Sequence, residues 1–161
     1  MARDYILRLI EQVATMLEAL ISRRKAGDII AAREDLENTS VRTVGFTLSE
    51  IKRLSPEEVA KILERSGALR VARAVMLAEL LLLDAQWHQE DRSEEQLMPN
   101  YVHAVCLLAD SLELLSSDER AHFRARMATA AEKLGELRDH PYVRERLARY
   151  ETSHPEGRPN A

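Results

Sequence analysis

Residues 68–89 read ALRVARAVMLAELLLLDAQWHQ, and this stretch decides the fold. Drawn as a helix, it carries large apolar side chains around most of its circumference. These are Val71, Val75, Met76, Leu77, Leu80, Leu81, Leu82 and Leu83. A helix that is apolar on most sides must be covered by other elements of the fold. We therefore expect residues 68–89 to form the central helix, with the remaining helices packed around it.

Start and stop signals before this segment predict four more helices. Apolar residues spaced three and four apart indicate a long helix over residues 3–26, with Gly27 as its C-terminal cap. Asp28 is placed to N-cap a short helix through residue 37, and residues 38–46 are expected to form a loop. Thr47 and Glu50 fit a capping box for a helix ending near residue 54. Ser55, followed by Pro56 and Glu58, starts a helix over residues 56–65.

Three further helices are predicted after the central one. Ser93 and Gln96 fit a cap for the first, but Pro99 falls in its early turns, so it is either kinked there or begins near Pro99. It continues to residue 115, and Ser116 starts the next helix. Pro141 opens a last one, and residues 152–161 are expected to be a disordered tail. The prediction is an all-α fold of about seven or eight antiparallel helices, in one domain over residues 1–151.

Composition narrows the class of protein. The 161 residues suit one domain, and the net charge of −4 argues against a dedicated nucleic-acid binder, which needs a basic surface for phosphates. The single cysteine, Cys106, suits a reducing compartment. The N-terminus lacks the apolar core of a signal peptide, and the most apolar run is too short to span a bilayer. We expect a cytoplasmic protein without nucleic-acid or membrane partners.

Two resemblances bear on the fold. Gly27, Asp28, Ala32 and Leu36 match the turn and second helix of a tetratricopeptide repeat, in which small residues let two helices approach and a large apolar one packs across. A second hairpin over residues 87–108 departs from that pattern, so a compact bundle is the alternative to a stack of repeats. The resemblance to tetratricopeptide repeats implies peptide or protein binding.

The opening residues 3–12, RDYILRLIEQ, and residues 78–81, AELL, also resemble an uncharacterised family of short bacterial all-helical proteins with degenerate tetratricopeptide-like hairpins. This resemblance covers about the first two thirds of the chain. It supports the fold and implies no activity.

Several side chains could carry chemistry, and each has a simpler interpretation. Asp84 and His88 lie one helical turn apart and could hold a metal, with His103 as a further candidate, but zinc needs three or four ligands. A surface hydrogen bond near a helix end is the simpler interpretation of the Asp84–His88 pair. Cys106 lies among apolar residues, which indicates a buried thiol rather than a nucleophile. Trp87 is interpreted as a core anchor or, alternatively, as the lining of a ligand groove.

Charged clusters and known motifs add no catalytic candidate. Residues 23–25, RRK, suit the negative end of a helix or, alternatively, an acid-binding site. Arg138, Arg144, Arg146 and Arg149 lie among acidic residues and are expected on solvated helix faces. The sequence contains no glycine-rich phosphate loop, nucleophile elbow or HExxH motif. No cofactor or catalytic residue is therefore predicted.

The first helix gives the strongest functional indication. Beyond its main apolar stripe it places Leu7, Ala14 and Ile21 on another side at heptad spacing, where another helix or a second subunit would cover them. We expect a non-catalytic protein-interaction or scaffold module that associates with itself as a homodimer. The alternative is a metal- or small-molecule-binding helical-bundle enzyme that uses Asp84, His88 and His103.

Overall fold

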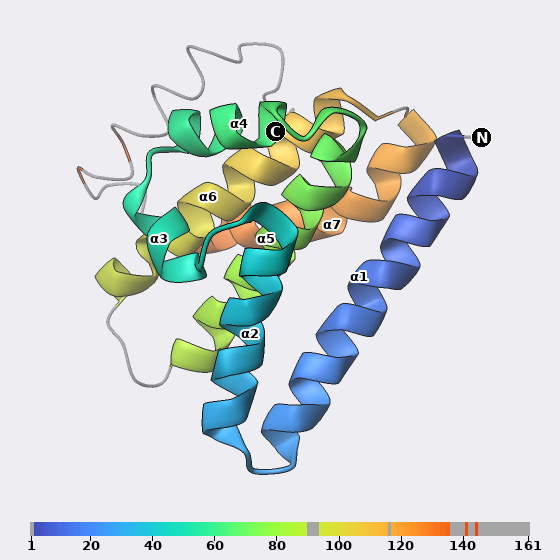
Figure 1. Ribbon diagram of the computed structural model, residues 1–161. Coiled ribbons are helices and arrows are strands. Elements are labelled where there is room, and N and C mark those ends of the chain that lie inside the picture. The colour runs from blue at the N-terminus through green and yellow to red at the C-terminus, as the bar shows by residue number, and fades with distance from the viewer. Residues whose placement is uncertain (1, 90–93, 116, 136–140, 142–143, 145–161) are drawn as a thin grey trace.

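The computed structural model describes residues 2–89, 94–115, 117–135, 141 and 144 (Figure 1). These residues contain seven α-helices, one short 3-10 helix and no strand, which confirms the all-helical prediction. The helices are α1 (Ala2–Lys25), α2 (Ile29–Val44), α3 (Leu48–Arg53), α4 (Pro56–Glu64), α5 (Arg70–His88), α6 (Glu94–Glu113) and α7 (Ser117–Gly135). The 3-10 helix η1 (Gly67–Leu69) leads into α5.

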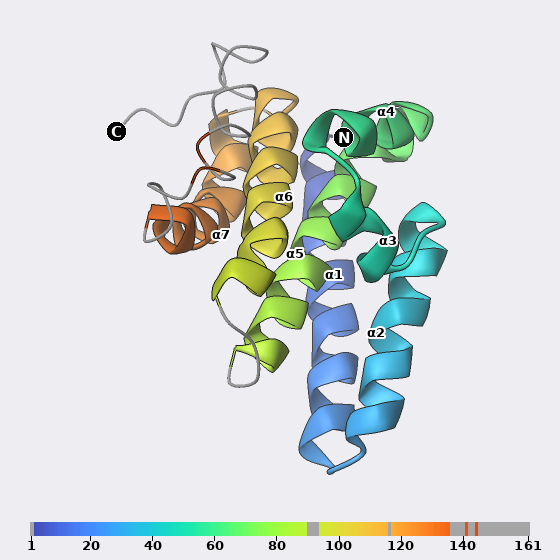
Figure 2. The same ribbon diagram turned by 90° about the vertical axis from the view of Figure 1, so that its left-hand side faces the viewer.

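Helix α5 lies at the centre, as its apolar circumference predicts. Twelve of its residues are buried, and Val75, Leu77, Leu80 and Leu81 are fully excluded from solvent. Helix α6 packs along it and is almost as deeply buried from Leu97 to Ala109. Figure 2 shows α5 and α6 between α7 on one side and α2 with α3 on the other. The main apolar core forms where these helices meet.

Helices α1 and α2 form an antiparallel hairpin. Gly27 takes a φ of 90°, a conformation that side chains disfavour, and the Asp28 side chain N-caps α2 by accepting a hydrogen bond from the Ala31 backbone N–H at 3.2 Å. Ala32 and Leu36 are buried in the core. The two helices meet at this turn and diverge away from it (Figure 1).

The predicted loop over residues 38–46 is wrong, because α2 continues to Val44. The hydroxyl groups of Thr39 and Thr43 each donate to the carbonyl four residues earlier, at 2.6 and 2.7 Å, and Ser40 donates to the Phe46 carbonyl at 2.7 Å. Buried positions for Thr39 and Ser40 outweigh the low helix propensity of this segment. The helix ends at Gly45, with a φ of 84°.

The strongest start signals are confirmed. Thr47 and Ser55 each N-cap a helix, and each forms a reciprocal capping box with the glutamate three residues later, Glu50 and Glu58. Helix α6 begins at Glu94 and contains Pro99, so it does not start near that proline. The proposed caps at Ser93 and Ser116, most of the helix expected after Pro141, and the tail from Thr152 lie outside the described residues.

The packing around α5 makes a stability prediction. Leu77→Ala should lower the free energy of unfolding by about 3 kcal/mol, because it leaves a cavity at a fully buried position. Leu69→Ala removes the same atoms from a side chain that is 48% exposed, and it should cost less than about 1 kcal/mol. Urea unfolding followed by circular dichroism measures both. Equal costs for the two variants would contradict the central position of α5.

Candidate functional site

A polar cluster is built around Asp84 on α5, whose side chain is fully buried. Arg33 of α2 places Nη1 at 2.6 Å from Asp84 Oδ1. Lys52 of α3 places Nζ at 2.8 Å from Asp84 Oδ2. Both cations keep some contact with solvent, at 32% and 17% exposure. The carboxylate is therefore bound by one guanidinium and one ammonium group from two different helices.

A third helix completes this cluster through Asn100 of α6. Its Nδ2 donates to Asp84 Oδ2 at 2.8 Å and to the Leu81 carbonyl at 2.9 Å. His88, one turn after Asp84, lies with Nε2 at 3.4 Å from Asp84 Oδ1 and also contacts the Arg33 guanidinium. We call Arg33, Lys52, Asp84, His88 and Asn100 the Asp84 network. It joins α2, α3, α5 and α6 through one carboxylate.

Electrostatics in the network favour the ionised carboxylate. Burial alone would raise the pKa of Asp84, but hydrogen bonds from Lys52, Asn100 and Arg33, together with the charge on Lys52, lower it to about 2. Glu37 of α2 lies close enough to sense this charge: burial and then the Asp84 carboxylate raise the pKa of Glu37, against the smaller opposing effects of Arg33 and Lys52. The site therefore holds one strongly ionised carboxylate beside a second that ionises less readily.

The three metal-ligand candidates do not come together. Asp84 and His88 are neighbours, but both oxygens of Asp84 already accept from cations, and His103 is buried elsewhere along α6. No group of three or more metal-ligating side chains gathers within the described part of the chain. The prediction that the Asp84–His88 pair lies on the helix surface is also wrong, because Asp84 is fully buried. Helices α2, α3 and α6 cover this end of α5 and turn a helix-surface position into an interior one.

Cys106 and Trp87 lie where their simpler interpretations place them. Cys106 is 4% exposed, and burial raises the pKa of its thiol, which makes it a poor nucleophile. Trp87 is buried in the main core, and the Arg24 guanidinium lies 4.8 Å from the centre of its ring. Arg24 also donates to the Trp87 carbonyl, and Arg23 pairs with Asp35 at 2.6 Å. Two of the three cations in residues 23–25 thus have partners within the fold.

A second buried charge interrupts the apolar surface of α5. Glu79 is 4% exposed and accepts two parallel hydrogen bonds from Arg126 of α7, at 2.8 Å from Nε and 2.7 Å from Nη2. This bidentate geometry is the strong form of a carboxylate–guanidinium pair, and it raises the pKa of Arg126. The ion pair fixes the position of α7 against α5.

Helix α1 borders two open grooves. One, of about 400 Å³, lies against α5 and α7, and we call it the α1–α7 groove. Ala14 is exposed and Ile21 partly exposed, and both of these predicted interface residues line it; the side chain of Leu7 lies outside the described part. The opposite wall carries Gln86 and the Glu79–Arg126 ion pair, together with Leu83 and Phe123, which are both buried.

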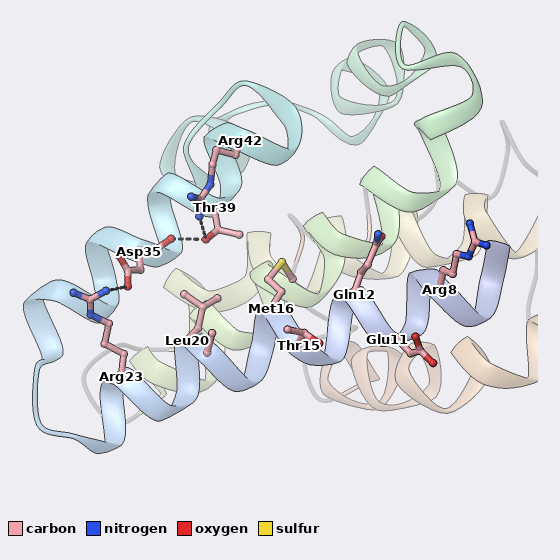
Figure 3. Close-up of a pocket in the computed structure, with 11 residues that line it drawn as sticks. Arg8, Glu11, Gln12, Thr15, Met16, Leu20, Arg23, Asp35, Thr39 and Arg42 are labelled. Carbon is pink, nitrogen blue, oxygen red and sulfur yellow. Dashed lines mark hydrogen bonds and ion pairs between the residues drawn. The ribbon is translucent and has the colours of Figure 1, made fainter. Parts of the chain in front are cut away.

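The other groove, of about 820 Å³, lies between α1 and α2, and we call it the α1–α2 groove (Figure 3). Its walls carry arginine, threonine and carboxylate side chains above an apolar floor that includes Leu20. Two surfaces of different chemistry therefore flank the same helix.

Comparisons with known proteins give one partial likeness. The chain is similar to the tRNA modification GTPase MnmE of Desulfitobacterium hafniense (strain Y51), with 30% identity over 110 residues. The match covers 66% of this chain and 24% of that protein, so it spans about a quarter of the relative's length. No known protein family and no solved structure matches the chain. Within the described residues, no helix combines the length and apolar character needed to cross a bilayer.

Sequence patterns single out Asp84 but not its partners. Arg33, Lys52 and Asn100 lie 51, 32 and 16 residues away along the chain. A carboxylate within an apolar helix indicates that hydrogen-bond donors or cations elsewhere in the chain must pair with it, because an unpaired buried charge is very costly. Nothing in the sequence says which of the 23 lysines and arginines supply them.

The network predicts unequal costs for two similar substitutions. Asp84→Ala leaves Arg33 and Lys52 without their carboxylate and should lower the free energy of unfolding by about 3 kcal/mol. The same substitution at Asp35 breaks the pair with Arg23, whose side chain is 51% exposed, and should cost less than about 1 kcal/mol. Chemical denaturation measures both. An Asp84→Ala variant as stable as Asp35→Ala would contradict the stabilising role of the network.

Stability should also depend on pH through Asp84. Its pKa falls from 3.8 to about 2 on folding, so its contribution is complete above pH 4 or so and is lost as the pH falls toward 2. The loss should reach about 2 kcal/mol. Asn at this position does not titrate, so the difference in unfolding free energy between wild type and Asp84→Asn should shrink by that amount between about pH 5 and about pH 2. A constant difference would contradict the lowered pKa.

Proposed function

We propose that this protein is a non-catalytic helical module that binds protein and associates with a second copy of itself through α1. The α1–α7 groove carries the proposal. Along it Ala14 of α1 is exposed and Leu17 and Ile21 are partly exposed, while Leu83 and Phe123 on the opposite wall are buried. Apolar surface left open beside a helix is typical of an interaction site.

The dimensions of α1 suit such an interface. Its 24 residues extend over about 36 Å, long enough to contribute much of a homodimer contact. Ala14 and Ile21 are one heptad apart, so they lie on the same side of the helix. In a two-fold dimer, the same strip of α1 would meet itself or the matching groove of the partner.

The chemistry of the interior supports a non-catalytic function. Asp84 is held ionised with both oxygens bound, Glu79 is bound by Arg126, and the Cys106 thiol is buried. The likeness to MnmE adds no activity to this proposal, because the 161 residues contain no glycine-rich phosphate loop of the kind that P-loop GTPases use.

The tetratricopeptide resemblance supports the same class of function. Gly27 makes the turn, and Ala32 and Leu36 are buried across the hairpin, as that repeat pattern requires. From this resemblance we take only the general function of tetratricopeptide repeats, which is the binding of peptides or proteins.

Sedimentation equilibrium tests the self-association. Wild type should sediment at twice the chain mass of 18.3 kDa. Ala14→Glu puts a charged carboxylate into the proposed contact and should raise the dimer dissociation constant roughly tenfold or more. The matched control is Ala121→Glu, at an exposed position of α7 outside both grooves, which should leave dimerisation unchanged.

Two outcomes would count against the proposal. A wild-type monomer at every concentration excludes self-association. Equal weakening by Ala14→Glu and Ala121→Glu excludes the α1–α7 groove as its site. Circular dichroism of both variants shows that any change in mass does not come from unfolding.

A further inference from the structure

The α1–α2 groove is the larger of the two grooves beside α1. Its volume of about 820 Å³ falls within the range of known ligand pockets. Figure 3 shows Met16 on the side of α1 that faces α2, whose Asp35, Thr39 and Arg42 form the opposite wall. The groove exists because α1 and α2 diverge from their shared turn (Figure 1).

Positive charge in the groove is only partly neutralised. Arg23 pairs with Asp35 near the turn. Arg42 donates to the Thr39 hydroxyl at 3.2 Å, and among the described residues neither Arg42 nor Arg8 forms a salt bridge with a carboxylate. Each wall thus carries one guanidinium group, that of Arg8 or of Arg42, for which the described residues supply no salt bridge.

The floor between these arginines is apolar. Leu20 is 4% exposed and Met16 is half-buried, and both contact the core from α1. Threonine hydroxyls at Thr15 and Thr39 lie beside them. A ligand that satisfies this surface needs carboxylates at its edges and apolar side chains facing inward.

We propose that the α1–α2 groove binds an acidic, amphipathic segment of a partner protein. The inference rests on the proposed function, since it treats the chain as a protein-binding module, and it assigns a second surface with its own ligand chemistry. Arg8 and Arg42 bind the carboxylates as charge-assisted donors, and Met16 and Leu20 receive the apolar face.

The same observations disfavour a nucleic acid in this groove. Binding to a phosphate backbone relies on many cations in an array, whereas in the described part of this groove only Arg8 and Arg42 lack a salt bridge. An apolar floor favours side chains over phosphates.

Phage display tests the ligand chemistry. The full-length protein is used to select from a random library of peptides about 12 residues long, which span about 18 Å when helical. The selected peptides should be enriched in Asp and Glu, with Leu, Ile, Val or Phe between them. Their affinity, measured by fluorescence anisotropy of the labelled peptides, should fall steeply as salt is added.

Matched charge reversals test the site. Arg8→Glu with Arg42→Glu should weaken binding of the selected acidic peptides about tenfold or more. Arg53→Glu with Arg65→Glu changes the net charge equally at exposed positions outside the groove and should change affinity less than about threefold. Thermal unfolding by circular dichroism confirms that both double variants are folded.

Several results would overturn this inference. They are the recovery of no binders, selection of basic or purely apolar peptides, equal losses in the two double variants, or single-stranded DNA that displaces the peptide and binds more tightly. Loss of self-association in Arg8→Glu with Arg42→Glu would assign the groove to a second copy instead. Failure of this inference can be distinguished from failure of the dimer proposal. The dimer is tested by the sedimented mass of wild type and Ala14→Glu, and Ala14→Glu should still bind the acidic peptides.

Discussion

The arrangement of the helices depends on one buried carboxylate. Asp84 lies inside the fold and draws Arg33 from α2, Lys52 from α3 and Asn100 from α6 to the same point on α5. Apolar contacts bring these helices together but tolerate small shifts along one another, whereas a buried ion pair penalises any arrangement that separates its partners. The network therefore specifies how α2, α3 and α6 are placed against the central helix.

Helix α7 is fixed by the same principle on the other side of α5. Glu79 and Arg126 make a bidentate pair there, and Phe123 and Ala130 supply buried apolar contacts. Helix α1 has no comparable buried ion pair among its described interactions. It meets the core through one apolar stripe and leaves grooves on both sides. Both grooves thus lie beside a helix that is held without a buried ion pair among the described residues.

Most of the local structure could be predicted from residue patterns. The capping boxes at Thr47 and Ser55, the turn at Gly27 and Asp28, and the central position of α5 all depend on neighbours in the sequence. The segment of α2 after Glu37 could not be predicted, because Thr39 and Ser40 become helical through burial against distant residues. The surface assignment of Asp84 was wrong for the same reason.

The sequence by itself determined the class of fold, most helix boundaries and the burial of Cys106, because these follow from short-range periodicity and capping chemistry. Only the tertiary structure decided which cations neutralise Asp84 and Glu79. It also placed Arg8 and Arg42 in a groove where the described residues give them no salt bridge. Those outcomes depend on which helices become neighbours. Charged side chains far apart in the sequence carry no local signal of their pairing. Which of them form a buried salt bridge depends on which helices pack together, because a charge can be buried only where an opposite charge lies beside it.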